Sequence, residues 1–167
     1  AIRTRNRIQE YVILHSRLGI PVLFTSECPH GHQALDGYLL PVSLASASTF
    51  SPSLVEQAFE VCGKQMREMG VDLALVSVMG VLRDPRWGRS EETFGEDPYL
   101  TGRMGAAYVR GMQGNGKSKY RKVDTTLKHF AVHSGPEGKR HGFNAVVSEK
   151  DLRETYLYGF KYCIDHA

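Results

Sequence analysis

Three short strand-like runs, each followed by a polar loop and then a helical pattern, constrain the fold of this chain most strongly. The runs cover residues 19–26, 71–78 and 123–127. The first is continuously apolar, which is typical of a strand that is buried on both faces of a parallel sheet. Because strands and helices alternate along the chain, we expect an α/β fold in which helices pack outside a parallel sheet.

The helices between these runs begin and end at recognisable residues. Ser51-Pro52 and Asp97-Pro98 each place a capping side chain before a proline, which suits the first position of a helix. Ser148 begins a last helix, with Asp151 in the position of the reciprocal capping residue. The turn Gly114-Asn115-Gly116 is expected to end the helix that begins at Pro98.

Two segments lie outside these strand and helix units. Residues of about 3–17 carry Ile8, Tyr11 and Val12 near one face, which predicts a helix before the first strand. Residues 33–50 are rich in small side chains, and we expect them to form a long loop.

The length of the chain limits the architecture. Its 167 residues suffice for one domain with a sizeable core. A closed eight-stranded (β/α) barrel needs about 250 residues. We therefore expect 1–167 to form part of a TIM-like (β/α)8 barrel, about half of it, with a small open α/β domain as the alternative.

Composition argues against several classes of function. The net charge of +3 is mild, and the one basic run, 117–122, is typical of a solvated loop, so nucleic-acid binding is not expected. No apolar run reaches the roughly 18 residues of a membrane span. The three cysteines lack paired spacing, which argues against a disulfide framework and favours a reducing, cytoplasmic setting.

The segment 84–98 is the most unusual part of the sequence. It combines arginines, acidic residues and the only tryptophan of the chain without helix or strand periodicity. Arg86, Trp87 and Arg89 are suited to bind a sugar or an acid, or to form an internal cluster of ion pairs. We expect Arg89 to face a ligand, and Glu91 and Glu96 to hold the loop.

Further polar residues follow the first and third strands. Glu27 ends the first, where its carboxylate can accept hydrogen bonds from ligand hydroxyls, and Lys128-His129 ends the third and supplies donors. Parallel α/β folds keep their sites at this end of the sheet. No glycine-rich phosphate loop of the dinucleotide or Walker type is present, so no nucleotide cofactor is expected.

The histidines leave a metal-dependent alternative open. His30 and His32 are one residue apart after a strand, and His129 and His133 follow later. This pairing resembles the ligands of amidohydrolase-type metal enzymes. No suitably placed later aspartate accompanies them, and our leading expectation includes no metal.

Three motifs together resemble glycoside hydrolase family 3, which includes β-glucosidases and β-xylosidases. The motifs are residues 19–31 with Glu27, residues 83–100, and residues 127–130. The segment 140–148 is similar to bacterial members of the family. The resemblance covers nearly the whole chain and implies a TIM-like barrel that is followed by a second α/β domain.

The resemblance also implies a ligand and the residues that bind it. It places Glu27, Arg89, Lys128 and His129 on the hydroxyls of the sugar at the bond to be cleaved, in a β-linked oligosaccharide or aryl glycoside. Arg140 and His141 are implied to face the substrate as well. The resemblance calls for no cofactor. Gly80 is a departure, because family members usually have an aspartate in its place.

The reaction implied by the resemblance is retaining hydrolysis by two carboxylates. The family's aspartate nucleophile and its acid/base residue match no position in 1–167, so none of the catalytic carboxylates is expected in this chain, and we expect it to be inactive alone. A different class of function is a non-catalytic carbohydrate-binding or self-assembling half-barrel, which would associate through its open sheet edges.

Overall fold

A parallel sheet of three strands lies at the centre of the computed structural model, which describes residues 2–114, 116 and 118–167. The strands are β1 (Thr25–Ser26), β2 (Leu73–Ala74) and β3 (Asp124–Thr125), in the order β1-β2-β3. Each regular ladder is short, but backbone hydrogen bonds extend the pairing on both sides, among them one of 2.9 Å from Lys128 N to Ser77 O. The predicted α/β fold is confirmed.

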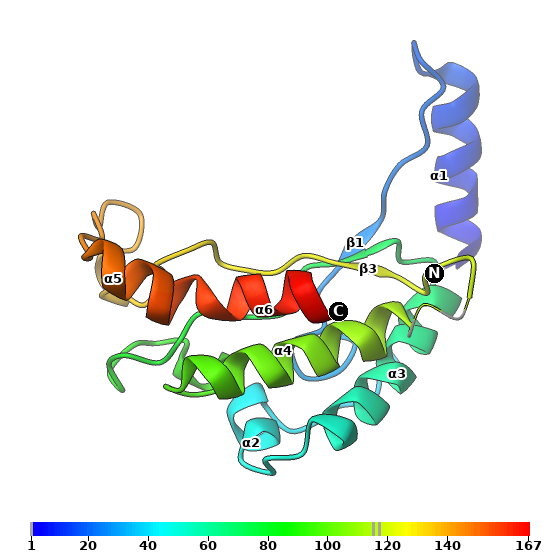
Figure 1. Cartoon of the computed structure of the whole chain (residues 1–167). Helices are drawn as coiled ribbons and strands as arrows, with labels where there is room; N and C mark the ends of the chain where they lie inside the picture. Colours follow the sequence, from blue (N-terminus) through cyan, green and yellow to red (C-terminus); the bar gives the residue numbers. More distant parts are fainter. Residues whose placement is uncertain (1, 115, 117) are drawn as a thin grey trace.

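Helices α2, α3, α4 and α6 lie together on one side of this sheet, and the helices occupy most of the predicted positions (Figure 1). The α-helices are α1 (Ile2–His15), α2 (Ser43–Ala47), α3 (Pro52–Glu68), α4 (Pro98–Gln113), α5 (Glu149–Asp151) and α6 (Tyr158–His166). A π-helical turn, Leu152–Tyr156, joins α5 to α6, so the predicted last helix is not one regular helix. Two short 3-10 turns, Ser90–Glu92 and Glu137–Lys139, lie in the loops after β2 and β3.

The predicted helix starts are confirmed at the level of individual hydrogen bonds. Ser51 accepts a hydrogen bond from the backbone of Leu54, and Asp97 accepts one of 2.9 Å from Leu100 N. Ser148 accepts one of 3.1 Å from Asp151 N. These contacts satisfy backbone N–H groups that have no partner inside the helix.

The ends of the two internal helices are set by glycines in a left-handed conformation. Gly70 has φ +76° after α3, and Gly114 has φ +102° after α4, a region that side chains other than glycine rarely adopt. Of the predicted turn 114–116 and the basic run 117–122, Asn115 and Lys117 lie outside the described residues.

The core is built around α4, which lies between α3 and α6 (Figure 1). Met104, Tyr108 and Met112 of α4 are fully buried. The helices approach closely because glycines stand at their contacts. A Cβ atom added at Gly63 would lie 2.6 Å from the carbonyl oxygen of Met112, closer than real Cβ atoms approach. This packing fixes the sheet and therefore the loops at its carboxyl end.

Two sequence predictions need correction. The segment 33–50 is not all loop, because 43–47 forms α2, whose Ser43 and Ala47 are buried. Their small side chains let this short helix pack closely. The first strand segment is not buried on both faces, since Leu23 is 71% exposed. Residues 21–26 alternate between exposed and half-buried, because alternate side chains point to opposite faces and only one face is covered.

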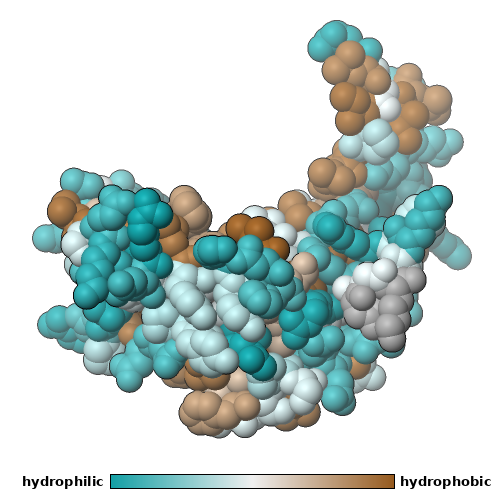
Figure 2. Space-filling view, viewed as in Figure 1, coloured by the Kyte–Doolittle hydropathy of each residue, from teal (hydrophilic) through white to brown (hydrophobic). Residues whose placement is uncertain are grey.

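Helix α1 stands apart from the other helices (Figure 1). It forms where predicted, but none of its residues is buried. Apolar side chains of α1 and of the segment after it remain on the surface, including Tyr11, Leu14 and Leu18 (Figure 2). Two hydrogen bonds of 2.7 and 2.8 Å tie Gln9 to the backbone of Val22. No described helix is long and apolar enough to cross a bilayer.

The close contact of α3 with α4 gives a first prediction. Gly63→Ala should destabilise the chain by about 1–2 kcal/mol, because overpacking costs about 1–3 kcal/mol and exceeds the gain in helix propensity of about 1 kcal/mol. Gly142→Ala is the matched control, since a Cβ atom there meets nothing within 4 Å. Urea unfolding followed by circular dichroism measures both. Equal stability of the two variants would contradict this account of the packing.

Candidate functional site

The loops that follow β1 and β3 are joined by an ion pair at the carboxyl end of the sheet. Lys128 Nζ lies 2.9 and 3.1 Å from the two carboxylate oxygens of Glu27. The Lys128 side chain is 16% exposed and that of Glu27 is 42% exposed, so the carboxylate remains open to a ligand. Two residues 101 positions apart in the sequence are thus brought together at the end of the sheet where the sequence analysis expected polar residues.

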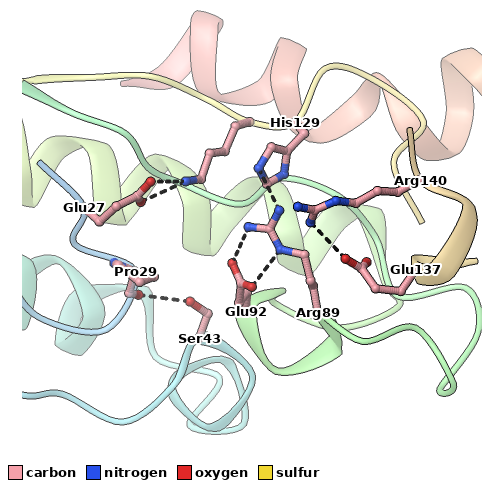
Figure 3. A network of polar contacts seen from close by, with 9 residues as sticks. Glu27, Pro29, Ser43, Arg89, Glu92, His129, Glu137 and Arg140 are labelled. Atoms are coloured by element: carbon pink, nitrogen blue, oxygen red, sulfur yellow. Dashed lines mark hydrogen bonds and ion pairs between the residues drawn. The ribbon is translucent and has the colours of Figure 1, made fainter. Parts of the chain in front are cut away.

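This ion pair forms part of the wall of a pocket of about 300 Å³. That volume lies at the small end of the range of ligand pockets. Ser43, at the start of α2, donates a hydrogen bond of 3.3 Å to the carbonyl oxygen of Pro29 and so fixes the loop after β1 (Figure 3). The lining residues are Glu27, Pro29, His30, Gln33, Val42, Ser43, Arg89, Glu91, Glu92 and Lys128.

Arg89 enters the pocket from the loop after β2 and is held by Glu92. Its Nε and Nη2 atoms each lie 2.7 Å from one carboxylate oxygen of Glu92 (Figure 3). These hydrogen bonds lower the pKa of Glu92 and raise that of Arg89, so both groups stay charged. The prediction that Glu91 and Glu96 hold the loop is corrected, because the 3-10 turn 90–92 brings Glu92 onto the side of Arg89.

His129 completes this part of the site through Arg89. Arg89 Nη1 lies 3.1 Å from His129 Nε2 (Figure 3). Because a guanidinium can only donate, Nε2 must accept, and the proton of the neutral ring is therefore on Nδ1. Burial, followed by the charge of Arg89, lowers the pKa of His129 to about 4. The buried Nδ1 atom has no hydrogen-bond partner among the residues that the structure describes.

Arg140 and His141, which the resemblance also placed near the substrate, differ in position, and Arg140 lies beside Arg89 and His129 (Figure 3). Arg140 donates to Glu137 at 2.9 Å, and Glu137 in turn packs against Gly88, beside Arg89 (Figure 3). His141 is exposed. Neither Arg140 nor His141 lines the pocket that holds Glu27 and Lys128.

Trp87 and Arg86 do not form an aromatic and cationic platform in this pocket. Trp87 is buried, with its ring edge against His133 and its Cη2 atom 3.6 Å from where a Cβ atom would stand at Gly80. Arg86 is exposed and is paired with Asp84, whose pKa it lowers to about 2. Trp87 therefore anchors the loop, and a Cβ atom at position 80 would meet its ring at an ordinary contact distance.

The histidines do not converge on a metal site. His32 is buried, and its Nε2 atom lies 3.3 Å from the hydroxyl of Ser26. His129 is engaged by Arg89, and its ring packs on that of His133 at a centroid distance of 4.6 Å. Within 2–114, 116 and 118–167, no three His, Cys, Asp or Glu side chains are grouped as metal ligands. The amidohydrolase-type alternative has no ligand set in that part of the chain.

Several lining residues were not singled out from the sequence. The sequence does not distinguish Glu92 from the other acidic residues of its loop. Its spacing of three residues from Arg89 was the available signal, because side chains at that spacing align on a 3-10 turn. Ser43 and Gln33 lie in the small-residue segment and carried no signal.

The arrangement is suited to a neutral ligand with many hydroxyl groups. It offers carboxylate acceptors and ammonium and guanidinium donors around one small pocket. Hydrogen bonds to charged groups are stronger than those between neutral groups. Because the cations are already paired with carboxylates, the pocket has little excess charge to attract an ionic ligand.

Comparisons with known proteins agree with this geometry. The chain is 38% identical to a xylan 1,4-β-xylosidase of Xylanibacter ruminicola over 90% of its own length and 20% of the relative's. Its structure matches the β-glucosidase of Erythrobacter marinus with a TM-score of 0.88 and 33% identity, over 97% of this chain and 22% of that one. It also matches a mutant β-glucosidase of Listeria innocua in complex with laminaribiose, with a TM-score of 0.84 and 29% identity, over 98% and 22% of the two chains.

The chain thus spans about a fifth of the length of these relatives. The sequence model of the glycosyl hydrolase family 3 N-terminal domain matches residues 1–167. The expected family and the expected partial barrel are both confirmed. The chain belongs to glycosyl hydrolase family 3, and its three-stranded α/β fold is part of the N-terminal barrel domain of that family.

Proposed function

We propose that this chain forms part of the sugar-binding subsite of a retaining glycosidase that releases terminal β-D-glucosyl or β-D-xylosyl residues. The observation that carries the proposal is the convergence of Glu27, Arg89 and Lys128, from three separate strand ends, on one small pocket. The relatives named above as β-glucosidases and a β-xylosidase support this choice of substrate.

In this proposal the residues of the chain bind and orient the sugar rather than break the bond. Glu27 accepts from sugar hydroxyls, while Lys128 and Arg89 donate to them. Fixing the sugar in this way lowers the entropic cost of bringing it to the reacting groups. Retaining hydrolysis needs a nucleophilic carboxylate and an acid about 5–5.5 Å apart. We assign neither role to a residue of 1–167, and we infer that both are supplied from outside this segment.

Activity of the full-length protein that carries this chain tests the proposal directly. It should hydrolyse p-nitrophenyl β-D-glucoside, p-nitrophenyl β-D-xyloside or both, with retention of configuration that proton NMR follows at the anomeric carbon. Residues 1–167 alone should show no hydrolysis above background. Sugar binding without hydrolysis in the full-length protein would favour the non-catalytic carbohydrate-binding alternative. A full-length protein that neither binds nor hydrolyses these sugars would refute the proposal.

The subsite assignment is tested by removing one donor at a time. Arg89→Ala and Lys128→Ala in the full-length protein should each lower kcat/KM by roughly ten- to a hundredfold, since a hydrogen bond to a charged group contributes about 1.5–3 kcal/mol. Lys150→Ala removes an exposed lysine of α5, distant in sequence from the pocket residues, and should leave kcat/KM unchanged. Steady-state kinetics with the better aryl glycoside measures all three. Unchanged kinetics for the first two would reject the assignment.

Acidification should destabilise the fold through His129. Burial, Arg89, His133 and Lys128 lower its pKa from 6.5 to about 4, against a smaller opposing effect of Glu92. The unfolded chain therefore takes up a proton at higher pH than the folded chain. The resulting stability is complete above pH 6.5 and is lost as the pH falls from 6.5 toward 4.

This pH dependence can be measured on residues 1–167. The free energy of unfolding should fall by about 1 kcal/mol between pH 7 and pH 5 through His129, a value that allows for solvent screening. His129→Gln should remove that part of the slope, whereas His141→Gln, at an exposed position, should not. His32 and His133, whose pKa values are also lowered by burial, account for the slope that remains. Identical slopes for both variants would contradict the assignment.

A further inference from the structure

The guanidinium of Arg89 has more donors than its partners use. Arginine carries five N–H groups. Glu92 takes one from Nε and one from Nη2, and His129 takes one from Nη1. Two N–H groups therefore remain, one on each terminal nitrogen. Because Arg89 lines the pocket, these are the groups available to sugar hydroxyls.

We propose that Glu92 is a positioning residue for sugar recognition, which acts by holding Arg89 so that its two remaining N–H groups serve the pocket. The inference rests on the proposed function, in that the ligand is the glucosyl or xylosyl residue bound there. Glu92 is inferred to affect sugar binding by positioning the guanidinium of Arg89.

The geometry of the pair supports this role. Both oxygens of Glu92 are engaged, in two parallel hydrogen bonds of 2.7 Å each, which fixes the plane of the guanidinium as well as its position. The two side chains are only 20% and 24% exposed. Water therefore competes weakly for these contacts. The 3-10 turn Ser90–Glu92 brings the carboxylate onto the same side as Arg89, three residues before it.

Other carboxylates would compete for Arg89 if Glu92 were neutral. Glu137 and Glu27 lie near enough to favour the charge of Arg89, and they stand on either side of it, after β3 and after β1. Without the charge of Glu92, the guanidinium would turn toward one of them. A turn toward Glu27 would occupy a sugar acceptor, and a turn toward Glu137 would draw Arg89 away from the pocket. The negative charge of Glu92 therefore keeps Glu27 free as a sugar acceptor and keeps Arg89 in the pocket as a donor.

Glu92→Gln tests the inference, because it keeps the shape of the side chain but removes the charge and one acceptor. In the full-length protein it should raise KM for the aryl glycoside by roughly tenfold or more, with a smaller change in kcat. Glu96→Gln is the matched control. It makes the same change of charge in the same loop, at an exposed residue that forms none of the ion pairs found among the described residues.

A double-mutant cycle shows whether Glu92 acts through Arg89. If it does, Glu92→Gln should cause no further loss of kcat/KM in the Arg89→Ala background. An added loss there of the full size seen in the wild type would overturn the inference, because Glu92 would then act on the ligand by itself. Equal kinetics for Glu92→Gln and Glu96→Gln would overturn it as well.

A folding defect and a misplaced Arg89 can be distinguished because they change different kinetic constants. A partly unfolded preparation lowers kcat at constant KM, whereas a misplaced Arg89 raises KM in fully folded protein. Thermal unfolding of each variant measures the folded fraction. If Glu92→Gln does not fold, Glu92→Asp retains the charge but cannot span both nitrogens at the same distance, and it should raise KM by a smaller factor. An unchanged KM for that variant would then overturn the inference.

The failure of this inference differs from a failure of the proposed function. If the wild-type protein neither binds nor hydrolyses β-glycosides, the proposed function fails. If the wild type is active and Glu92→Gln equals its control, the function stands and only the role of Glu92 is rejected.

Discussion

The burial of α4 between α3 and α6 is the constraint on which the rest of the structure depends. The helix is covered on nearly every side, so its contacts admit little change of volume. Glycines at its own contacts and on α3 let backbone meet backbone where side chains would separate the helices. The hydroxyl of buried Tyr108 donates to the carbonyl oxygen of Cys28, the residue after Glu27. The core thus reaches directly to the chain segment that bears a sugar-binding candidate.

The site combines this rigidity with paired charges. Lys128 with Glu27 forms an ion pair between the loops after β3 and β1, and Arg89 with Glu92 forms a second one within the loop after β2. A half-buried cation without a partner would be costly to desolvate, and a pair that was fully enclosed could not reach a ligand. Partial exposure of Glu27 meets both requirements. The pocket can therefore exchange water for hydroxyl groups without separating its charges.

The sequence predicted the framework better than the contacts within it. Helix starts at Ser51, Asp97 and Ser148 were predictable because a capping side chain acts on backbone only three residues away. The position of Glu27 and Lys128 at the same end of the sheet followed from parallel topology, whereas their ion pair did not, because β1 and β3 are not neighbours in the sheet. The choice of Glu92 over Glu91 and Glu96 did not, because it depends on a 3-10 turn with no periodic signal. Helix α2 was missed for a similar reason, since its small residues resemble those of a loop.

Helix α1 shows what the absence of a buried face means for cooperativity. A helix of 14 residues is marginal in water by itself, so its order relies on a few polar contacts, such as those of Gln9 with Val22 and of Arg5 with the carbonyl oxygen of Met69. These contacts are far fewer than those around α4. We therefore expect the two helices to belong to different cooperative units of this chain. The amide hydrogens of α1 should exchange with solvent through local opening, while those of α4 should report the unfolding of the whole core.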